Sequence, residues 1–204
     1  MARADIGAVV VIQAVPFRFE PADHAYLDID TGEEFPHCTG LLERAGWLHP
    51  EWYTEESSVR GTAVHTLTAQ YDLGALDAKT CISRYRGWLL AWVDLIGKVP
   101  HGPMSVEEPR VHPYWRFGCR QDRTGAFYLR EGVLEIKSGL RDRSHAIQTA
   151  LQAISYESEC HVPPEYQIRL CAYIGREGQI SLEEHDQAAD LKEAYRILKT
   201  YCRR

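Results

Sequence analysis

The sequence contains no apolar run long enough to cross a membrane as a helix, which requires about eighteen or more consecutive apolar residues. Its most apolar stretch, GAVVVIQAV at residues 7–15, is short and follows one arginine with an aspartate beside it. A signal peptide is one interpretation of this stretch, but we expect an edge or buried strand. We therefore expect a cytoplasmic protein with no membrane partner.

Clustered cysteines are also missing. The six cysteines include no C-x-x-C pair and no spacing typical of a metal site, so we expect free thiols. No internal repeat or low-complexity tract divides the 204 residues, and this length suits one domain better than two. We predict one domain over residues 1–204, with N-terminal strands and helices in 1–100, a catalytic core in 101–160 and a C-terminal hairpin and helix in 161–204.

The chain lacks an excess of positive charge, and its formal net charge of −6 argues against indiscriminate binding to nucleic acid. The charge is unevenly distributed, however. Residues 110–143 contain eight Lys or Arg against four Asp or Glu, so this segment carries +4 and the remainder −10. A polyanion could approach one locally basic face. The alternative is that these arginines only keep exposed strands soluble.

The segment from residue 117 to residue 152 has the hydrophobic pattern of a strand, a turn, a second strand and a helix. The pattern assigns Leu129 to the first strand and predicts a polar turn at Arg130–Gly132. Glu135 and Lys137 are two residues apart on the second strand, so their side chains leave the same face. Asp122 lies on the neighbouring strand. Such charges are costly to gather unless something compensates them.

A divalent cation is one such compensation. Two carboxylates and a backbone carbonyl form a hard-oxygen site suited to Mg²⁺ or Mn²⁺. A lysine beside this site can orient a water molecule and stabilise developing phosphate charge. The alternative is an ordinary salt bridge between Glu135 and Lys137 on a solvated sheet face. If carboxylate repulsion is strong, Asp122→Asn should raise the thermal stability of the metal-free protein.

Asp122, a spacer of twelve residues and Glu135-Ile136-Lys137 resemble the D…(D/E)-x-K signature of the PD-(D/E)XK nuclease superfamily. Four further segments follow that family's order and are most similar to its RecB-like, bacteriophage-type members. They are the helix motif RGTAVH at residues 60–65, the adjacent glutamates at 107 and 108, the turn DRTG at 122–125, and a helix that carries Gln148 and Gln152. The resemblance covers roughly residues 17–200.

This resemblance implies an α/β fold with a central mixed β-sheet flanked by helices, as in restriction-endonuclease-like cores. It also implies a Mg²⁺- or Mn²⁺-dependent deoxyribonuclease that hydrolyses phosphodiester bonds, and we expect a phage- or prophage-type exonuclease. DNA is the expected partner and a recombination protein is a second candidate, while the oligomeric state is open. No iron–sulfur cluster is expected, because the clustered C-terminal cysteines of some relatives are missing here.

The resemblance also assigns roles to individual residues. One or two metal ions would be held by His65, Glu108, Asp122, Glu135 and the carbonyl of Ile136. The catalytic residues would be Asp122, Glu135, Lys137 and Gln148. Contacts to the substrate would come from Arg123, Arg143 and Gln152.

Several alternatives remain open at this point. Glu107 and Glu108 face opposite sides of their strand, and the spacing to Val111 favours Glu108 for the metal side. The distance from Lys137 favours Gln148 as the functional glutamine, whereas Gln152 restores the family's Q-x-x-x-Y pattern one turn later. The step from residue 118 to residue 122 is one longer than usual, which predicts a bulge or a shifted strand.

Two functional alternatives accompany the nuclease. One is a non-cleaving DNA-binding or assembly module on a nuclease fold. The other is a small metal-dependent hydrolase of nucleotides or other phosphodiesters.

Elsewhere the patterns predict strands within residues 8–29 and a turn at residues 30–32. They also predict helices at 50–74, 78–99 and 186–201, with Val59 and Ile82 among the apolar positions of the first two. Further strands are predicted at 104–111, 166–174 and 179–182, and a loop at 100–103.

Overall fold

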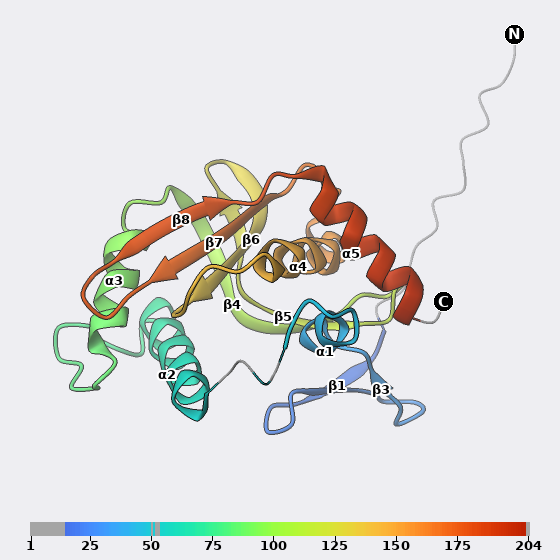
Figure 1. Cartoon of the computed structure of the whole chain (residues 1–204), viewed down its shortest axis with the longest axis horizontal. Coiled ribbons are helices and arrows are strands. Elements are labelled where there is room, and N and C mark those ends of the chain that lie inside the picture. Colours follow the sequence, from blue (N-terminus) through green and yellow to red (C-terminus); the bar gives the residue numbers. More distant parts are fainter. Residues whose placement is uncertain (1–14, 50, 52–53, 203–204) are drawn as a thin grey trace, which may run out of the picture.

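The computed structural model describes residues 15–49, 51 and 54–202. It is an α/β fold in which a mixed five-stranded sheet is flanked by helices, with a small antiparallel three-stranded sheet beside it (Figure 1). Most of the strand expected at residues 7–15 lies outside the described residues. None of the described helices has the length and apolar character that a membrane span requires.

The large sheet has the strand order β4-β5-β6-β7-β8. Strands β6 and β7 pair in parallel and every other neighbouring pair is antiparallel. Helix α4 makes the crossover between the two parallel strands, as a parallel pair requires. The bounds are β4 His101–Val111, β5 Gly118–Phe127, β6 Arg130–Lys137, α4 Ser144–Cys160, β7 Ile168–Ile174 and β8 Ile180–Glu184.

Both faces of this sheet are covered, which explains why β6 is buried along most of its length. Val133 packs against Ala153 and Tyr156 of α4, while Leu134 and Ile136 point the other way and pack with α3. Helices α1 (Cys38–Arg44), α4 and α5 (Ala188–Tyr201) share one core. Helices α2 (Glu55–Asp72) and α3 (Arg86–Ile96) pack at the other end of the sheet.

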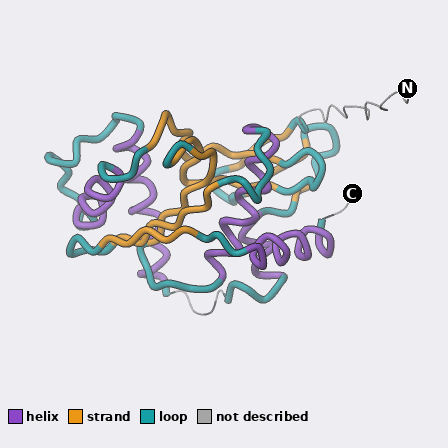
Figure 2. Tube along the Cα trace, turned by 90° about the horizontal axis from the view of Figure 1, so that it is seen from above, coloured by secondary structure: helices purple, strands orange, loops and turns teal. Residues whose placement is uncertain are grey.

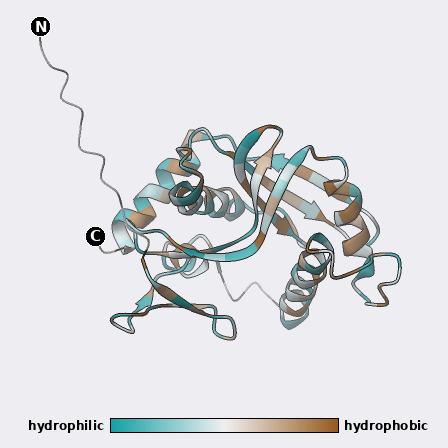
Figure 3. Ribbon diagram, turned by 180° about the vertical axis from the view of Figure 1, so that it is seen from behind, coloured by the Kyte–Doolittle hydropathy of each residue, from teal (hydrophilic) through white to brown (hydrophobic). Residues whose placement is uncertain are grey.

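The views agree on this arrangement. Figure 2 shows the helices gathered on two sides of the twisted strands, and Figure 3 shows α3 as the most uniformly apolar of the helices around the sheet. Helix α2 is different, because only Val64 and Thr68 are buried along its eighteen residues. Most of α2 is therefore available to line a surface hollow.

The small sheet consists of β1 (Phe17–Glu20), β2 (Ala25–Asp28) and β3 (Glu34–Phe35). It is joined to the start of β5 by a bridge between His37 and Gly118. A Cβ atom at Gly118 would lie 2.3 Å from Cγ of Tyr26, so only glycine allows the Tyr26 ring to lie against this strand. This contact fixes the small sheet opposite α2.

The structure corrects several expected element boundaries. The turn between β5 and β6 is formed by Tyr128 and Leu129, both with positive φ, so Arg130–Gly132 belongs to β6 and Leu129 is fully exposed. Helix α3 begins at residue 86, and the turns and irregular chain of residues 78–85 leave Ile82 fully exposed. Val59 is 46% exposed.

Strand β4 begins at His101, where a loop was expected. The bulge expected between residues 118 and 122 is absent, since pairing runs without a register shift from Val111↔Gly118 to Met104↔Gly125. The irregularity lies instead between His101 and Met104.

Candidate metal centre

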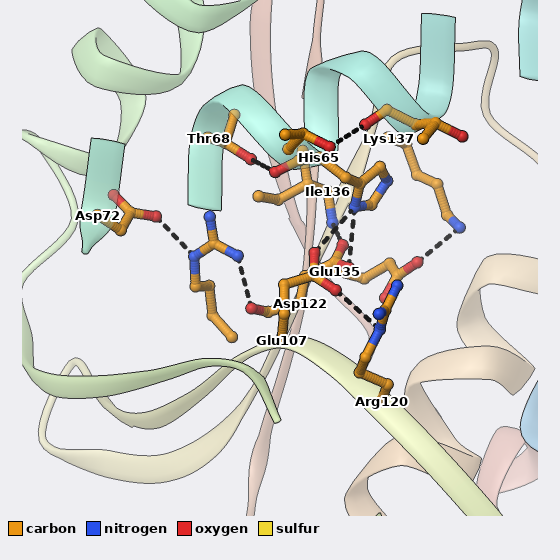
Figure 4. Close-up of polar contacts among 12 residues, drawn as sticks. His65, Thr68, Asp72, Glu107, Arg120, Asp122, Glu135, Ile136 and Lys137 are labelled. Carbon is orange, nitrogen blue, oxygen red and sulfur yellow. Dashed lines mark hydrogen bonds and ion pairs between the residues drawn. The ribbon is translucent and has the colours of Figure 1, made fainter. Parts of the chain in front are cut away.

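Four elements bring charged side chains to one place at the edge of the large sheet (Figure 4). Helix α2 begins after Thr54, whose hydroxyl oxygen accepts a hydrogen bond from the Ser57 backbone N–H at 3.1 Å. Three turns later this helix presents His65. Strands β4, β5 and β6 contribute Glu107, Asp122 and Glu135.

His65, Glu107 and Asp122 form a compact group. Nδ1 of His65 lies 3.0 Å from Oδ1 of Asp122 and 3.5 Å from Oε1 of Glu107. One possible ligand atom from each residue lies within 4.8 Å of the others, and this is the one group of this kind among the described residues. His65 and Asp122 are therefore brought together as the sequence predicted.

The choice between the adjacent glutamates is corrected. Glu107 has a left-handed backbone with φ of 53° and turns its carboxylate toward His65, where it also pairs with Arg120 at 3.1 Å. Glu108 points away, and its Oε2 lies 2.9 Å from Nη2 of Arg110. The side chain of Glu108 is 60% exposed. The structure thus places Glu107, not Glu108, at the centre.

Strands β5 and β6 separate at the centre. Their last paired residues are Arg123 and Leu134, and beyond them the Ile136 N–H donates to Oδ2 of Asp122 at 2.6 Å. The N–H and C=O of one strand residue project toward the same edge, so the Ile136 carbonyl lies on the Asp122 side. The hydrophobic side chain of Ile136 is fully buried on the opposite face.

Glu135 is held by three donors rather than by the His65 group. Its Oε1 accepts hydrogen bonds from Lys137 at 2.7 Å and from Gln148 at 2.8 Å, and its Oε2 accepts one from Gln152 at 2.5 Å. Oε1 of Gln148 in turn accepts from Lys137 at 2.9 Å. Both glutamines of α4 therefore face Glu135. The sequence alternatives, Gln148 or Gln152, are not exclusive, because both side chains reach this carboxylate.

The structure separates the two glutamines by their surroundings. Gln148 lines the cleft together with Lys137, whereas Gln152 is 2% exposed beneath Glu135. The expectation that Gln152 contacts substrate is therefore corrected, because its side chain is buried and its amide nitrogen donates to Glu135.

Arg123 is also corrected as a substrate contact. Its side chain has no exposed surface. The guanidinium donates to Asp72 Oδ2 and to the Asp122 carbonyl, both at 2.6 Å, and lies over the Trp92 ring. Trp92 donates its indole N–H to the same Asp72 carboxylate at 3.0 Å. Arg123 thus connects α2 and α3 to the strand that carries Asp122.

Arg143 lies outside the cleft and pairs with Asp190 of α5, a buried carboxylate. It is half exposed, but its position gives no contact with the His65 group. The sequence did not single out Arg120, whose guanidinium borders both Glu107 and the Phe19 ring. Spacing could have identified it. Arg120 is two residues before Asp122 on the same strand, so both side chains leave the same face.

The centre opens into a cleft of about 890 Å³ between α2 on one side and α1 with the turn between β1 and β2 on the other. The cleft is lined at its base by His65, Glu107, Asp122, Glu135 and Lys137. His24, at the tip between β1 and β2, forms part of the opposite wall and also has positive φ. A substrate that enters here meets both the carboxylates and the Lys137 ammonium.

Opposite charges determine the protonation of the centre. Burial lowers the pKa of His65, but the Asp122 and Glu107 carboxylates outweigh it and raise the pKa to about 10. Burial likewise acts against the Lys137 ammonium, and the Glu135 carboxylate outweighs it, so the pKa of Lys137 is raised. For His145, by contrast, burial and then Lys137 lower the pKa to about 4.

The donor set fits a hard divalent cation. Oε1 of Glu107 is buried without a hydrogen-bond partner, and only the His65 ring, 3.5 Å away, compensates its charge. A divalent cation could take the place of the imidazolium proton there. An imidazole and two carboxylates are ligands that Mg²⁺, Mn²⁺ and other divalent ions accept. Glu135 would extend this set only by exchanging one of its present donors.

No protein-family model and no curated protein matches the chain. The assignment of function therefore depends on the motifs and the geometry.

Proposed function

We propose that the chain is a metal-dependent DNA nuclease of the PD-(D/E)XK type. One observation carries this proposal: His65, Glu107 and Asp122 meet at the base of a cleft that also holds the Glu135–Lys137 pair. A salt bridge on a solvated sheet face does not account for this arrangement, because Glu135 is 3% exposed and the side chains of Lys137, Gln148 and Gln152 all donate hydrogen bonds to it.

The residues have distinct tasks in the proposed reaction. His65, Glu107, Asp122 and the Ile136 carbonyl would hold the cation. When bound, the cation would supply Lewis-acid stabilisation of phosphate charge and lower the pKa of a nucleophilic water.

Lys137 acts in this scheme as a cation at the scissile phosphate. Its ammonium is oriented by two acceptors, Glu135 Oε1 and Gln148 Oε1, so its remaining proton is directed rather than free to rotate. A preorganised ammonium stabilises charge that develops on the phosphate oxygens in the transition state. Gln148 keeps this ammonium in place through its contacts with both Glu135 and Lys137.

The test is cleavage of end-labelled linear DNA and of closed circular plasmid, with Mg²⁺ or Mn²⁺ and with EDTA. We expect metal-dependent loss of linear DNA with the circle spared, which is the exonuclease result, and nicking of the circle would make the protein an endonuclease. Lys137→Ala should reduce cleavage by at least a hundredfold. The matched control is Lys98→Ala, since Lys98 forms an exposed pair with Asp94 on the surface.

Two outcomes oppose the proposal. Unchanged cleavage in Lys137→Ala would remove Lys137 from the chemistry. Metal-independent binding of DNA by the wild-type protein without cleavage would favour the non-cleaving DNA-binding module.

A further inference from the structure

A second hollow of about 500 Å³ lies beside the cleft, and we call it the flanking groove. It borders the cleft at two points of the chain. Lys137 lines the cleft and Ser138 the groove, while Gly61 lines the cleft and Arg60 the groove. The full lining is Arg60, Trp88, Ser138–Leu140, Tyr173–Arg176 and Gln179–Ser181.

The flanking groove differs from the cleft in charge. Its lining includes two arginines, Arg60 and Arg176, and no aspartate or glutamate. Within the described residues neither guanidinium forms an ion pair or a hydrogen bond, and Nε of Arg60 is buried without a partner. On a protein with net charge −6, two unpaired arginines in one hollow form a favourable position for an anion.

The fold fixes the position of Arg176. A Cβ atom at Gly87 would lie 2.0 Å from the Arg176 carbonyl oxygen, so the turn between β7 and β8 packs directly on α3. Figure 1 shows this turn beside α3. Trp88, the next residue of α3, is half-buried and lines the groove. Backbone packing thus brings the Arg176 position and Trp88 to the lining of the same groove.

The groove also has an apolar rim. Leu140, which lines the groove, is 92% exposed. Arg141 stacks on Tyr173 with its Cζ 5.2 Å from the ring centroid, while Glu183 lies 3.8 Å from its Nε. The rim therefore combines apolar and cationic groups.

We infer that the flanking groove binds an unpaired nucleic-acid strand next to the scissile phosphate, an inference that rests on the proposed function. Arg60 and Arg176 contact phosphates, and one or two bases lie against Trp88 and Leu140. Cationic grooves with aromatic platforms bind single strands in this way, because every base offers a stacking face. A duplex keeps its bases stacked inside and presents no such face. The volume suits about one or two nucleotide units rather than a duplex.

The first experiment measures binding without cleavage. A labelled single-stranded oligonucleotide and its duplex are titrated in EDTA with Lys137→Ala protein, using fluorescence anisotropy. Adding Arg60→Ala and Arg176→Ala should weaken single-strand binding about tenfold or more and duplex binding less than twofold. The slope of log affinity against log salt should fall by about 1.4, since two phosphate contacts are lost.

Matched variants control for charge and folding. Arg18→Ala with Arg196→Ala removes the same charge outside both hollows and should leave binding unchanged. Arg60→Lys with Arg176→Lys should retain most of the affinity. Equal weakening of single strand and duplex, or no difference from the Arg18 and Arg196 control, would overturn the inference.

A single exposed position gives a second test. Leu140→Asp places a carboxylate at the groove rim and should weaken single-strand binding several-fold without changing the melting temperature. Leu129→Asp makes the same change at a fully exposed leucine in the β5–β6 turn, outside the groove. This variant should bind single strands as the unchanged protein does. Equal single-strand affinity of the two variants would contradict the proposal that the flanking groove binds a single strand.

These measurements separate the groove from the nuclease. If wild-type protein never cleaves but the Arg60 and Arg176 variant still loses single-strand binding, the proposed function fails and the groove stands. If cleavage is metal-dependent but the variant binds and cleaves normally, the groove fails alone.

Discussion

His65 on α2 and Asp122 on β5 are joined by a 3.0 Å contact between Nδ1 and Oδ1, and this contact links the helix to the sheet at the candidate metal centre. The carboxylate raises the pKa of the imidazole to about 10 despite burial, so the metal-free centre carries an imidazolium at neutral pH. The proton and a cation would therefore compete for the same ring nitrogen.

This competition predicts pH-dependent metal affinity. Below the His65 pKa, binding of Mn²⁺ through the imidazole must release about one proton, so affinity should rise up to about tenfold per pH unit between roughly pH 6 and pH 9. Calorimetry in two buffers with different ionisation enthalpies counts the proton directly. His65→Ala should bind more weakly and lose the pH slope. A flat profile in wild-type protein would exclude His65 as a ligand.

Asp122→Asn tests the same contact through stability in EDTA. Repulsion between carboxylates would make this substitution stabilising, but the structure shows Asp122 compensated by His65 and by the Ile136 N–H. We therefore expect Asp122→Asn to destabilise the metal-free protein rather than to stabilise it. At pH 7 the variant should lose about 1–3 kcal/mol in the free energy of unfolding, measured with urea.

The pH dependence of that loss has a definite sign. The folded pKa of His65 lies above its unfolded value of 6.5, so its stabilising contribution is complete below pH 6.5 and is lost as pH rises through about 10. The difference between wild-type and Asp122→Asn protein should accordingly shrink at pH 10. A stabilised variant at pH 7 would instead support repulsion as the dominant interaction.

The sequence contained enough information to select the central residues, for a physical reason. Two-residue spacing on a strand predicts that Glu135 and Lys137 share a face. Gln148 was selected by the resemblance, and the structure places its amide against both residues. Hydrophobic patterns predict individual strands and helices, whereas the central mixed sheet flanked by helices was implied by the resemblance. The structure confirms this fold class.

The wrong assignments depend on contacts between distant residues. Alternation puts Glu107 and Glu108 on opposite faces but does not say which face meets α2. The local sequence gives no sign that Arg123 is buried. Its partner Asp72 lies 51 positions earlier, and only the fold brings the two side chains together. The turn at Tyr128 and Leu129 carries no Gly or Asn signal, although both residues have positive φ. Patterns within a short stretch of sequence cannot predict any of these three features.

The two glutamines of α4 should respond differently to removal. Gln148 touches Lys137 and lines the cleft, so Gln148→Ala should lower kcat about tenfold or more with a small change in melting temperature. Gln152 is buried under Glu135, so Gln152→Ala should chiefly lower stability, by about 1–3 kcal/mol, because a buried carboxylate oxygen loses its donor. Steady-state kinetics and thermal melting of both variants decide this. The opposite pattern would assign the catalytic register to Gln152.

The buried pair between Arg123 and Asp72 gives a prediction about positioning. Arg123→Ala leaves the Asp72 carboxylate buried with the Trp92 indole as its one remaining side-chain partner among the described residues. The free energy of unfolding should therefore fall by about 3–5 kcal/mol. Arg130→Ala, which breaks an exposed pair with Glu184, should cost at most about 1 kcal/mol. Urea denaturation compares them.

The same variant separates positioning from phosphate contact. Because Arg123 also holds the Asp122 carbonyl and the end of α2, its loss should weaken Mn²⁺ binding even though Arg123 is not a candidate ligand. Replacing both Arg123 and Asp72 by leucine should restore part of the stability, since no charge is left buried without a partner. If Arg123→Ala instead preserved stability and metal binding while weakening DNA binding, Arg123 would be a substrate contact after all.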